Sequence, residues 1–310
     1  MTDNKIVERE LLRQKLYNKD VLQWMINKLP NLRYKEVCHL LLRYIFNKNI
    51  TKTSNDDPVF ITTRSNIAET QLQKDFIYNK LDIDCGEVIK ELEQRLLKCS
   101  KKINKYIIDN DKKVSIVDGK IVYKKRCYTD ISDLAKKYPQ YINYALALNI
   151  RYTYLHLLNH GLARKFKEMD YSPSDATEGF ASAFNHYFDN FCSAFPDLEV
   201  PFGSQGSFFD NTVWKSREVF VNPPFDDSLM SCAMERVYTY LEENKEEKRK
   251  FIFTLPNWKE YPELDKLKVS KWTTNVKIYK KGELPFIDYM NNQKTIYPCD
   301  IAEIILETKN

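Results

Sequence analysis

The residues best suited to chemistry are Asn222, Pro223, Pro224 and Phe225, which directly follow the apolar run 219–221. An adenine amino group is a poor nucleophile because its lone pair is delocalised into the ring. The Asn222 side-chain carbonyl and the Pro223 main-chain carbonyl can accept hydrogen bonds from both N–H groups and direct the lone pair at an incoming methyl group. Phe225 can stack on the base. The pattern therefore favours an enzyme that methylates a planar amino nitrogen.

The flanking sequence predicts the elements that hold these residues. The run 219–221 is β-branched and aromatic and too short for a helix, so it predicts a buried strand. Two prolines can neither pair in a sheet nor continue a helix, so the chain leaves the sheet at Asn222. Asp226 suits a helix N-terminus, and apolar residues at three- and four-residue spacing follow over 229–241. In open α/β sheets ligands bind beyond the carboxyl ends of strands, where this order places Phe225. The alternative is an ordinary Asn-Pro-Pro turn.

A second segment, 251–258, repeats this order of apolar run, proline, polar residue and aromatic ring. Its Trp258 can line the same pocket opposite Phe225, where it would contact the substrate. It can equally be a core tryptophan that caps the sheet.

Composition limits the class of protein. The chain has 310 residues, 43% of them hydrophobic, which is enough for a sizeable core. No apolar stretch approaches the roughly 18 residues of a membrane span, and the first residues lack the apolar region of a signal peptide, so we expect a soluble intracellular protein, with nucleus and cytoplasm not distinguished. Seven scattered cysteines without a C-x-x-C pair favour neither disulfides nor a zinc knuckle. His156 and His160 lie four apart on a predicted helix, but without a third ligand we expect no metal site.

Basic residues are concentrated in one segment. The net charge is +5, which permits nucleic-acid binding without requiring it. The concentrated residues are Lys101, Lys102, Lys105, Lys112, Lys113, Lys120, Lys124, Lys125 and Arg126, interleaved with Tyr106, Tyr123 and Tyr128. They can follow a phosphate backbone, or form a solvated face.

The spacing of apolar residues differs between the N-terminal and C-terminal parts of the chain. Helical periodicity is found over 6–48, 87–107 and 131–166, and a hairpin is predicted over 114–123. Short apolar runs then predict strands around Gly179, 191–195, 207–209, 218–221, 251–255, 276–279 and 301–307, with helices around Asn185 and Met230. This alternation predicts an α/β sheet. We expect a mainly helical domain over 1–150 and a catalytic domain over 151–310.

Several ordered blocks resemble one known family. They are Glu178-Gly179-Phe180-Ala181-Ser182, the run from Phe191 to Asp197, the run from Phe202 to Ser207, and Asn222-Pro223-Pro224-Phe225. Together they resemble the phosphorylated C-terminal-domain interacting factor family of cap-specific mRNA adenosine N6-methyltransferases. The resemblance runs from about residue 141 to about Trp258.

The resemblance implies a class I, Rossmann-like methyltransferase domain behind a helical domain. It implies S-adenosylmethionine as methyl donor and a capped RNA whose first nucleotide is 2′-O-methyladenosine as substrate. By motif, Glu178, Phe180 and Ser182 would lie beside the donor, Asp197 near its ribose or amino acid end, and Ser207 and Phe208 beside its adenine. Asn222, Pro223, Pro224 and Phe225 would hold the target base. Arg151 is placed on the RNA path, and the helical domain over 1–150 is expected to contact RNA or the cap.

The chain also departs from the family pattern. It leaves no room for the WW module by which animal members contact the polymerase tail, so that module is expected to be absent. A protein partner is compatible with the sequence but not identified by it. With seven glycines and no G-x-G-x-x-G, the donor loop is not the usual glycine-rich turn.

Two other functions stay open. One is a related enzyme that methylates adenine inside RNA or DNA, or a protein glutamine, although those families more often have Tyr than Phe after Pro-Pro. The other is a non-catalytic RNA-binding subunit, against which intact Asn222 and Phe225 argue. The sequence does not decide whether the 7-methylguanosine cap or prior 2′-O-methylation is required, nor which residues contact the cap guanine, nor the oligomeric state.

Overall fold

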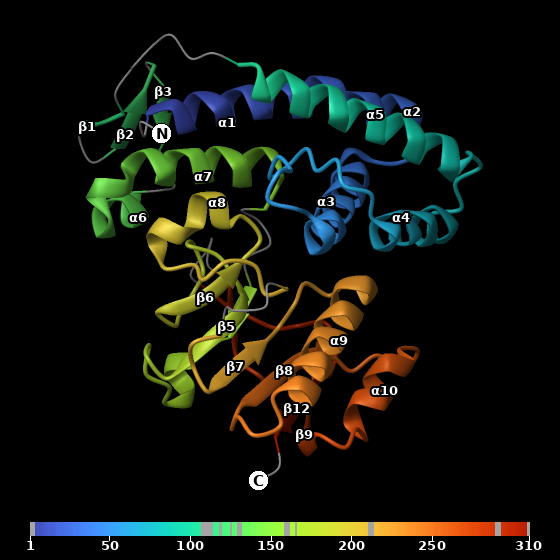
Figure 1. Cartoon of the computed structure of the whole chain (residues 1–310), viewed down its shortest axis with the longest axis vertical. Coiled ribbons are helices and arrows are strands. Elements are labelled where there is room, and N and C mark those ends of the chain that lie inside the picture. Colours follow the sequence, from blue (N-terminus) through green and yellow to red (C-terminus); the bar gives the residue numbers. More distant parts are fainter. Residues whose placement is uncertain are drawn as a thin grey trace. The chain divides into compact units, whose positions relative to one another are not determined.

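The chain forms two compact units, Met1–Leu158 and Asn159–Asn310. The computed structural model describes residues 4–106, 114–117, 120–124, 126–128, 132–157, 162–164, 166–209, 214–288 and 293–308, and the statements below concern these residues. The first unit is mainly helical, and the second is built on a mixed β-sheet (Figure 1). The prediction of a mixed α/β chain with a helical region in front is therefore confirmed at this level.

The helical unit begins with one long, nearly continuous helical segment. Its elements are α1 (Asn4–Leu16), the π-helix η1 (Tyr17–Leu22), α2 (Gln23–Lys28), α3 (Tyr34–Thr51), α4 (Asn66–Tyr78), α5 (Cys85–Asn104), β1 (Ser115–Val117), β2 (Lys120–Tyr123), β3 (Arg126–Tyr128), α6 (Ser132–Lys137), the 3-10 turn η2 (Pro139–Tyr141) and α7 (Ile142–Tyr154). Helix α1 packs against both α7 and α5 (Figure 1). The predicted hairpin is confirmed, since β1 and β2 pair antiparallel, and β3 adds a third strand.

The apolar spacing explains how α5 docks. Asp84 caps its N-terminus by accepting from the Gly86 and Glu87 amides. Leu92, Leu96 and Ile103 recur on the face that the unit buries. Such a three- and four-residue repeat places apolar side chains on one side of a helix. Capping and burial together therefore fix both the start and the orientation of this helix.

The second unit contains two sheets. Its elements are β4 (Leu162–Arg164), η4 (Phe166–Met169), β5 (Ala176–Ala181), β6 (Asn190–Ser193), α8 (Pro196–Glu199), η5 (Val200–Phe202), β7 (Glu218–Val221), α9 (Asp227–Glu243), β8 (Lys250–Pro256), α10 (Pro262–Lys268), β9 (Thr273–Tyr279), β10 (Phe286–Asp288), β11 (Gln293–Thr295) and β12 (Ile301–Glu307). The large sheet has the order β6-β5-β7-β8-β12-β9, and the small one the order β11-β10-β4. Strands β6, β5, β7 and β8 are parallel, and β12 is antiparallel to both neighbours.

Alternating side chains divide the large sheet into two faces. Val221 and Phe253 belong to a core with Met230 and Leu264, so α9 and α10 cover that face (Figure 1). The side chains that alternate with these, including Phe220, point to the other face of the sheet. They pack against an aromatic group that includes Phe166 and Phe188. Burial on both faces explains why these strands are continuous apolar runs rather than alternating ones.

Three predictions of secondary structure are wrong. The helix expected up to residue 166 ends at Tyr154, and the strand β4 (Leu162–Arg164) lies in the remainder. No helix forms around Asn185, because Ser182 and Asn185 form a side-chain turn in which the Asn185 Oδ1 accepts from the Ser182 amide and hydroxyl. No strand forms over 207–209. The chain instead meets β6 earlier, where Ser204 forms a single parallel bridge with Phe191.

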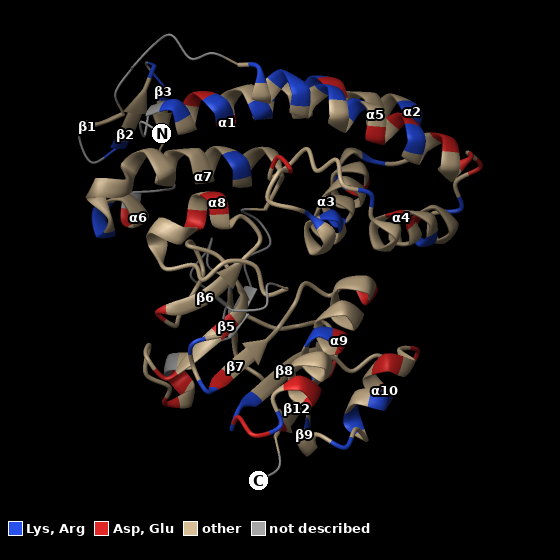
Figure 2. Cartoon of the chain, in the orientation of Figure 1, with Lys and Arg blue, Asp and Glu red and all other residues tan. Residues whose placement is uncertain are grey.

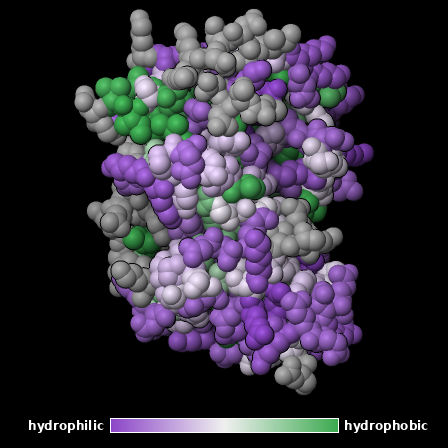
Figure 3. All heavy atoms as spheres, turned by 60° about the vertical axis from the view of Figure 1, so that its left-hand side comes forward, coloured by the Kyte–Doolittle hydropathy of each residue, from purple (hydrophilic) through white to green (hydrophobic). Residues whose placement is uncertain are grey.

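The lengths and apolar content of the helices bear on whether the chain can cross a membrane. In the part of the chain that the structure describes, no helix is both long and apolar enough to cross a membrane. The face shown in Figure 3 is hydrophilic over most of its described surface, with hydrophobic atoms gathered in small areas.

Candidate active site at the carboxyl ends of β5, β7 and β8

The turn after β7 has the predicted strand, turn and helix. Strand β7 ends at Val221, and the chain leaves the sheet at Asn222. The Asp226 amide donates to the Pro224 carbonyl at 2.7 Å, and the Asp226 Oδ1 accepts from the Leu229 amide at 2.9 Å as the N-cap of α9. These two bonds fix the turn from both sides, so the direction of its carbonyl groups is set before any ligand arrives.

Asn222 carries the most informative atom of the site. Its Oδ1 is buried and accepts no hydrogen bond within the described residues. A buried carbonyl without a donor costs roughly 1–3 kcal/mol. Buried polar side-chain atoms are paired in most cases. The Asn222 Oδ1 is one of several described atoms without a partner, and its place at the carboxyl end of a parallel strand makes it available to a ligand's N–H.

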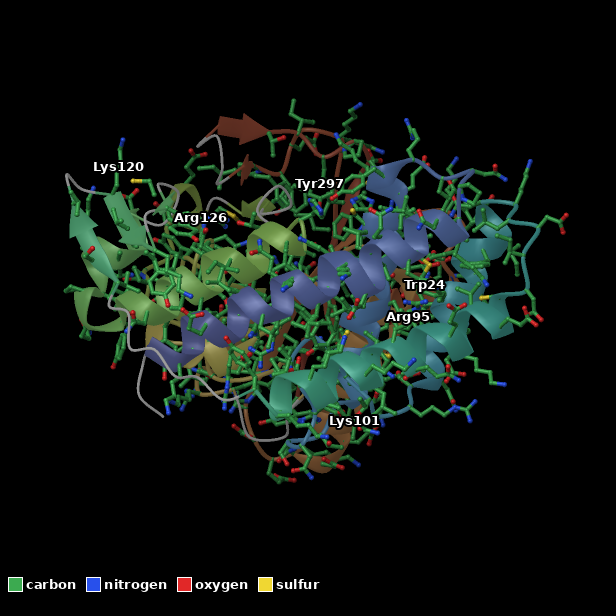
Figure 4. All side chains as sticks on the ribbon, turned by 90° about the horizontal axis from the view of Figure 1, so that it is seen from above. Trp24, Arg95, Lys101, Lys120, Arg126 and Tyr297 are labelled. Carbon is green, nitrogen blue, oxygen red and sulfur yellow. The ribbon has the colours of Figure 1, made fainter. Side chains whose placement is uncertain are left out.

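Aromatic rings surround the same turn. The half-buried Phe225 ring lies 6.2 Å from the Trp258 ring, edge to face, and 4.7 Å from the Tyr297 ring, between centroids. Tyr297 also packs on Phe286 at 4.8 Å. Trp258 is 37% exposed, so it is not a core residue. Placing Trp258 beside Phe225 was therefore right in geometry, and Tyr297, labelled in Figure 4, completes the group.

Sequence reasoning missed Tyr297. A weaker signal was present, because Tyr297-Pro298 also places an aromatic ring and a proline directly after a strand, β11, although with the ring before the proline. Burial raises the pKa of Tyr297 to about 12, so its hydroxyl stays neutral.

The loop after β8 is tied to the start of α9. The Tyr261 hydroxyl lies 2.9 Å from the Ser231 hydroxyl and donates to the Asp227 carbonyl at 3.2 Å. Trp258 precedes Tyr261 in this loop, and the two rings lie 6.4 Å apart. The tie holds the Trp258 loop to the helix whose N-terminus follows Phe225.

On the neighbouring strand β5, Glu178 has a positioning role. It is buried, and its Oε1 accepts from the Tyr187 amide at 2.5 Å and the Phe188 amide at 3.1 Å. Burial raises the pKa of Glu178 to about 7, although the two amides favour the charged form. Glu178 therefore shapes the loop that follows β5.

Glu199 joins two loops and was missed by sequence reasoning. It is fully buried; its Oε1 accepts from the Ala183 amide at 2.9 Å and its Oε2 from the Phe195 amide at 3.3 Å. Ala183 follows β5 and Phe195 follows β6. The carboxylate thus holds together the two loops at which a donor is expected. Ser182 is also occupied, because its hydroxyl donates to Asn185.

The phenylalanines at the donor end have different positions. Phe208 is 2% exposed and packs on Gly179 so closely that a Cβ there would lie 2.8 Å from its ring. Phe180 is half-buried and stacks on Phe208 at 4.6 Å. The expectation that Phe208 borders the donor's adenine is corrected to a packing role, since its ring is covered. Ser207 is buried, with its hydroxyl accepting from the Phe209 amide at 3.2 Å.

Asp197 is exposed on α8, four residues after the end of β6. A carboxylate after the second parallel strand is the usual partner of ribose hydroxyls in dinucleotide-binding folds. Its position therefore agrees with the role that the resemblance implies.

Strands β5 and β7 are parallel neighbours, with Glu178 opposite Phe220, so Phe180 and Asn222 reach the same edge of the sheet.

Arg151 does not fit the RNA role assigned to it. Its side chain is fully buried in the helical unit, where Nε and Nη2 donate to Glu10 at 3.0 and 2.7 Å. A buried, bidentate pair of this kind is structural. His156 lies beyond the end of α7 with a φ of 58° and contacts the Tyr34 hydroxyl at 3.0 Å, and His160 lies outside the described residues. No group of three metal-binding side chains is found among the described residues.

A comparison with protein families agrees with this geometry. The family model described as "Phosphorylated CTD interacting factor 1 WW domain" matches residues 124–288, more than half of the chain. The chain belongs to this family. The match includes β5, β6, β7, β8 and the whole Asn222 turn. It also contradicts the expectation that the family's WW module is absent, since the matching model is the one that carries that description.

Two curated relatives match a shorter segment. A mouse protein named mRNA (2'-O-methyladenosine-N(6)-)-methyltransferase is 44% identical over 85 residues, and a human protein of the same name is 42% identical over 85 residues. Each match covers 27% of this chain and 12% of the relative's length. The chain therefore spans only a small part of the length of these relatives.

Proposed function

We propose that this chain is a cap-specific mRNA adenosine N6-methyltransferase, which transfers methyl from S-adenosylmethionine to N6 of the cap-adjacent 2′-O-methyladenosine. The observation that carries the proposal is the buried, donor-free Oδ1 of Asn222 beside the Phe225 ring. The family and the two relatives named for this reaction support it.

We propose a class I, Rossmann-like fold for the second unit. Strands β6, β5, β7 and β8 are parallel and lie side by side in this order. From β5 the chain adds β6 on one side and then β7 and β8 on the other, so the direction in which strands are added reverses between β5 and β7. The Ser204 bridge adds a vestigial strand outside β6. Ligands of such sheets bind in the crevice beyond the carboxyl ends at the reversal. That is the edge where Phe180 and Asn222 meet.

The residues present fit S-adenosylmethionine, which when bound supplies the electrophilic methyl group. Phe180 keeps part of its ring exposed, and Asp197 is exposed after β6. Glu178 and Glu199 hold the loops around them through four backbone amides. We propose that Phe180 and Asp197 contact the donor, with Ser182, Ser207 and Phe208 shaping its pocket from behind.

The chain's own part in the reaction is to prepare the amine. The Asn222 Oδ1 accepts one N–H of the adenine N6, and the Pro223 carbonyl, to which no described residue donates, accepts the other. Both bonds draw electron density toward nitrogen and favour a pyramidal amine whose lone pair is free to react. Phe225 stacks on the base, with Trp258 and Tyr297 holding the ring in place.

The test is transfer of labelled methyl to three short RNAs: capped with a first adenosine, the same RNA uncapped, and capped with the adenosine placed internally. The proposal predicts labelling of the capped first adenosine alone. Equal labelling of all three would replace it with a general adenine methyltransferase. Donor binding without labelling would leave a non-catalytic subunit.

A further inference from the structure

A groove of about 490 Å³ opens in the helical unit between the α1–η1 segment and the β2–β3 hairpin. We name it the Arg126 groove and define it by Gln14, Lys15, Asn18, Lys124, Arg126 and Tyr128. None of the described residues that line it is acidic. Figure 2 shows Lys and Arg on the three-stranded sheet and both signs of charge on α1, whose acidic residues Glu8 and Glu10 are paired with Lys124, Arg13 and Arg151.

The groove's cations are available to a ligand. Lys124 is paired with Glu8, but Lys15 and Arg126 are exposed and form no ion pair with any residue that the structure describes. A cation on a protein surface with no carboxylate beside it attracts anions, and two such cations on one groove, Lys15 and Arg126, favour a ligand with several negative charges. The ligand is therefore expected to carry more than one negative charge.

The uncharged side chains that line the groove indicate which class of anionic ligand it binds. The half-buried Tyr128 offers part of its ring, and the amides of Gln14 and Asn18 make no hydrogen bond within the described part of the chain. Single-stranded nucleic-acid sites combine cations that follow phosphates with aromatic rings on which bases stack. Amide groups can donate to and accept from base edges. A phosphopeptide would use the cations but would leave the ring and both amides without a partner.

The backbone beside the groove is also unusual. Asn18 lies in η1, a six-residue π-helix between α1 and α2. Such segments are rare, occur frequently at functional sites, and change the direction of the side chains they carry. Lys120, on β2 of the same small sheet as Arg126, is exposed and lies toward the sheet's outer end (Figure 4), which extends the positive path beyond the groove.

We infer that the Arg126 groove binds the body of a single-stranded RNA, with phosphates on Lys15 and Arg126, a base on Tyr128 and base edges on Gln14 and Asn18. The inference rests on the proposed function, because the RNA is the substrate of that reaction. It adds a contact with the transcript in the helical unit that does not require the cap.

The test is fluorescence anisotropy of a labelled, uncapped single-stranded RNA with the full chain at several salt concentrations. Lys15→Ala/Arg126→Ala is expected to weaken binding roughly tenfold and to reduce the slope of log affinity against log salt by about 1.4, since each lost phosphate contact on a single strand removes about 0.7. Tyr128→Ala should weaken binding by roughly tenfold through lost stacking and leave the slope unchanged. The matched control is Lys74→Ala/Lys90→Ala, two exposed lysines on α4 and α5, which should bind as the wild type does.

Two results would overturn the inference. One is RNA binding by the groove variants equal to that of the control pair. The other is a wild type that binds a phosphoserine peptide instead of RNA and loses that binding in the groove variants. The proposed function is tested separately by Asn222→Ala, which should keep its affinity for the uncapped RNA and lose methyl transfer to the capped one. Groove binding without any methyl transfer by the wild type would remove the proposed function alone.

Discussion

Two buried polar centres of the molecule differ in one respect that separates structure from function. In the helical unit, the Glu10 carboxylate accepts from Arg151, Arg13 and Tyr154. Burial alone would raise the pKa of Glu10, but the Arg151 and Arg13 guanidinium groups lower it to about 2. In the second unit, the Asn222 Oδ1 is equally hidden from water and has no donor among the described residues.

The difference shows what each centre is for. A network whose members satisfy one another needs nothing further, and its removal is expected to affect folding. An acceptor that is buried and unsatisfied costs stability, and it is retained where a ligand supplies the missing bond. By this criterion Glu10 and Arg151 are structural, and the Asn222 Oδ1 fits the substrate-binding role that we propose for it, because it is also at the carboxyl end of β7 beside aromatic rings.

The largest expected effect is on catalysis. Asn222→Ala should reduce methyl transfer to capped RNA by roughly 100- to 1000-fold, the usual effect of removing one preorganised hydrogen-bonding group. Thermal unfolding should change little, because Asn222 forms no side-chain bond through this oxygen. Single-turnover transfer and calorimetry of the same preparation check both halves. Full transfer by the variant would remove Asn222 from the reaction.

Removing a partner from the paired Glu10 network should instead lower the stability of the fold. Arg151→Ala leaves the buried Glu10 carboxylate without its main partner and should lower the free energy of unfolding by roughly 3–5 kcal/mol. The control is Arg33→Ala, which breaks an exposed ion pair with Glu36 and should cost less than about 1 kcal/mol. Chemical denaturation measures both. Equal stability of the two variants would contradict a structural role for Arg151.

The aromatic group should matter less than the amide. Phe225→Ala should lower transfer roughly tenfold, since stacking on one ring contributes about 1–3 kcal/mol. Phe225→Tyr keeps the ring and should be nearly neutral. Trp258→Ala should have a smaller effect, because Trp258 contacts the edge of Phe225. Single-turnover rates order the three variants, and an unchanged Phe225→Ala rate would place the base elsewhere.

The smallest expected effect concerns Glu178 and depends on pH. Burial raises the pKa of Glu178 from 4.5 to about 7, so the folded state binds a proton that the unfolded state releases between these values. Stability contributed by this group is therefore present below about pH 4.5 and is lost as pH rises toward 7. Glu178→Gln should raise Tm by about 5 °C near pH 8 and leave it unchanged near pH 4.5. Glu260→Gln, at an exposed position, is the control, and a Glu178→Gln variant with unaltered pH dependence would contradict the assignment.

Part of the fold and of the candidate site could be predicted from the succession of neighbouring residues alone. The succession of β-branched run, asparagine, two prolines and aromatic ring predicts β7, its turn and α9, because each step follows from short-range backbone restrictions. The same order predicts β8 and places Trp258. These features depend on neighbours along the chain.

Contacts distant in sequence account for what was missed. Glu10 lies 141 residues from Arg151, and nothing local to Arg151 indicates that it is buried. Tyr297 and Glu199 acquire their roles from β12 and from the two loops after β5 and β6. The expected helix at Asn185 was replaced by a side-chain turn, which competes with helix formation for the same backbone groups.

The central claim, that the Asn222 Oδ1 accepts a hydrogen bond from the target amine, is tested most directly by a binding cycle. Affinities are measured for two capped RNAs that differ only in the first base, adenine or purine without the amino group, with the wild type and with Asn222→Ala. The account predicts that the wild type binds the adenine RNA at least roughly fivefold more tightly, as expected for one buried hydrogen bond, and that Asn222→Ala binds both equally. The same preference in both proteins would contradict it.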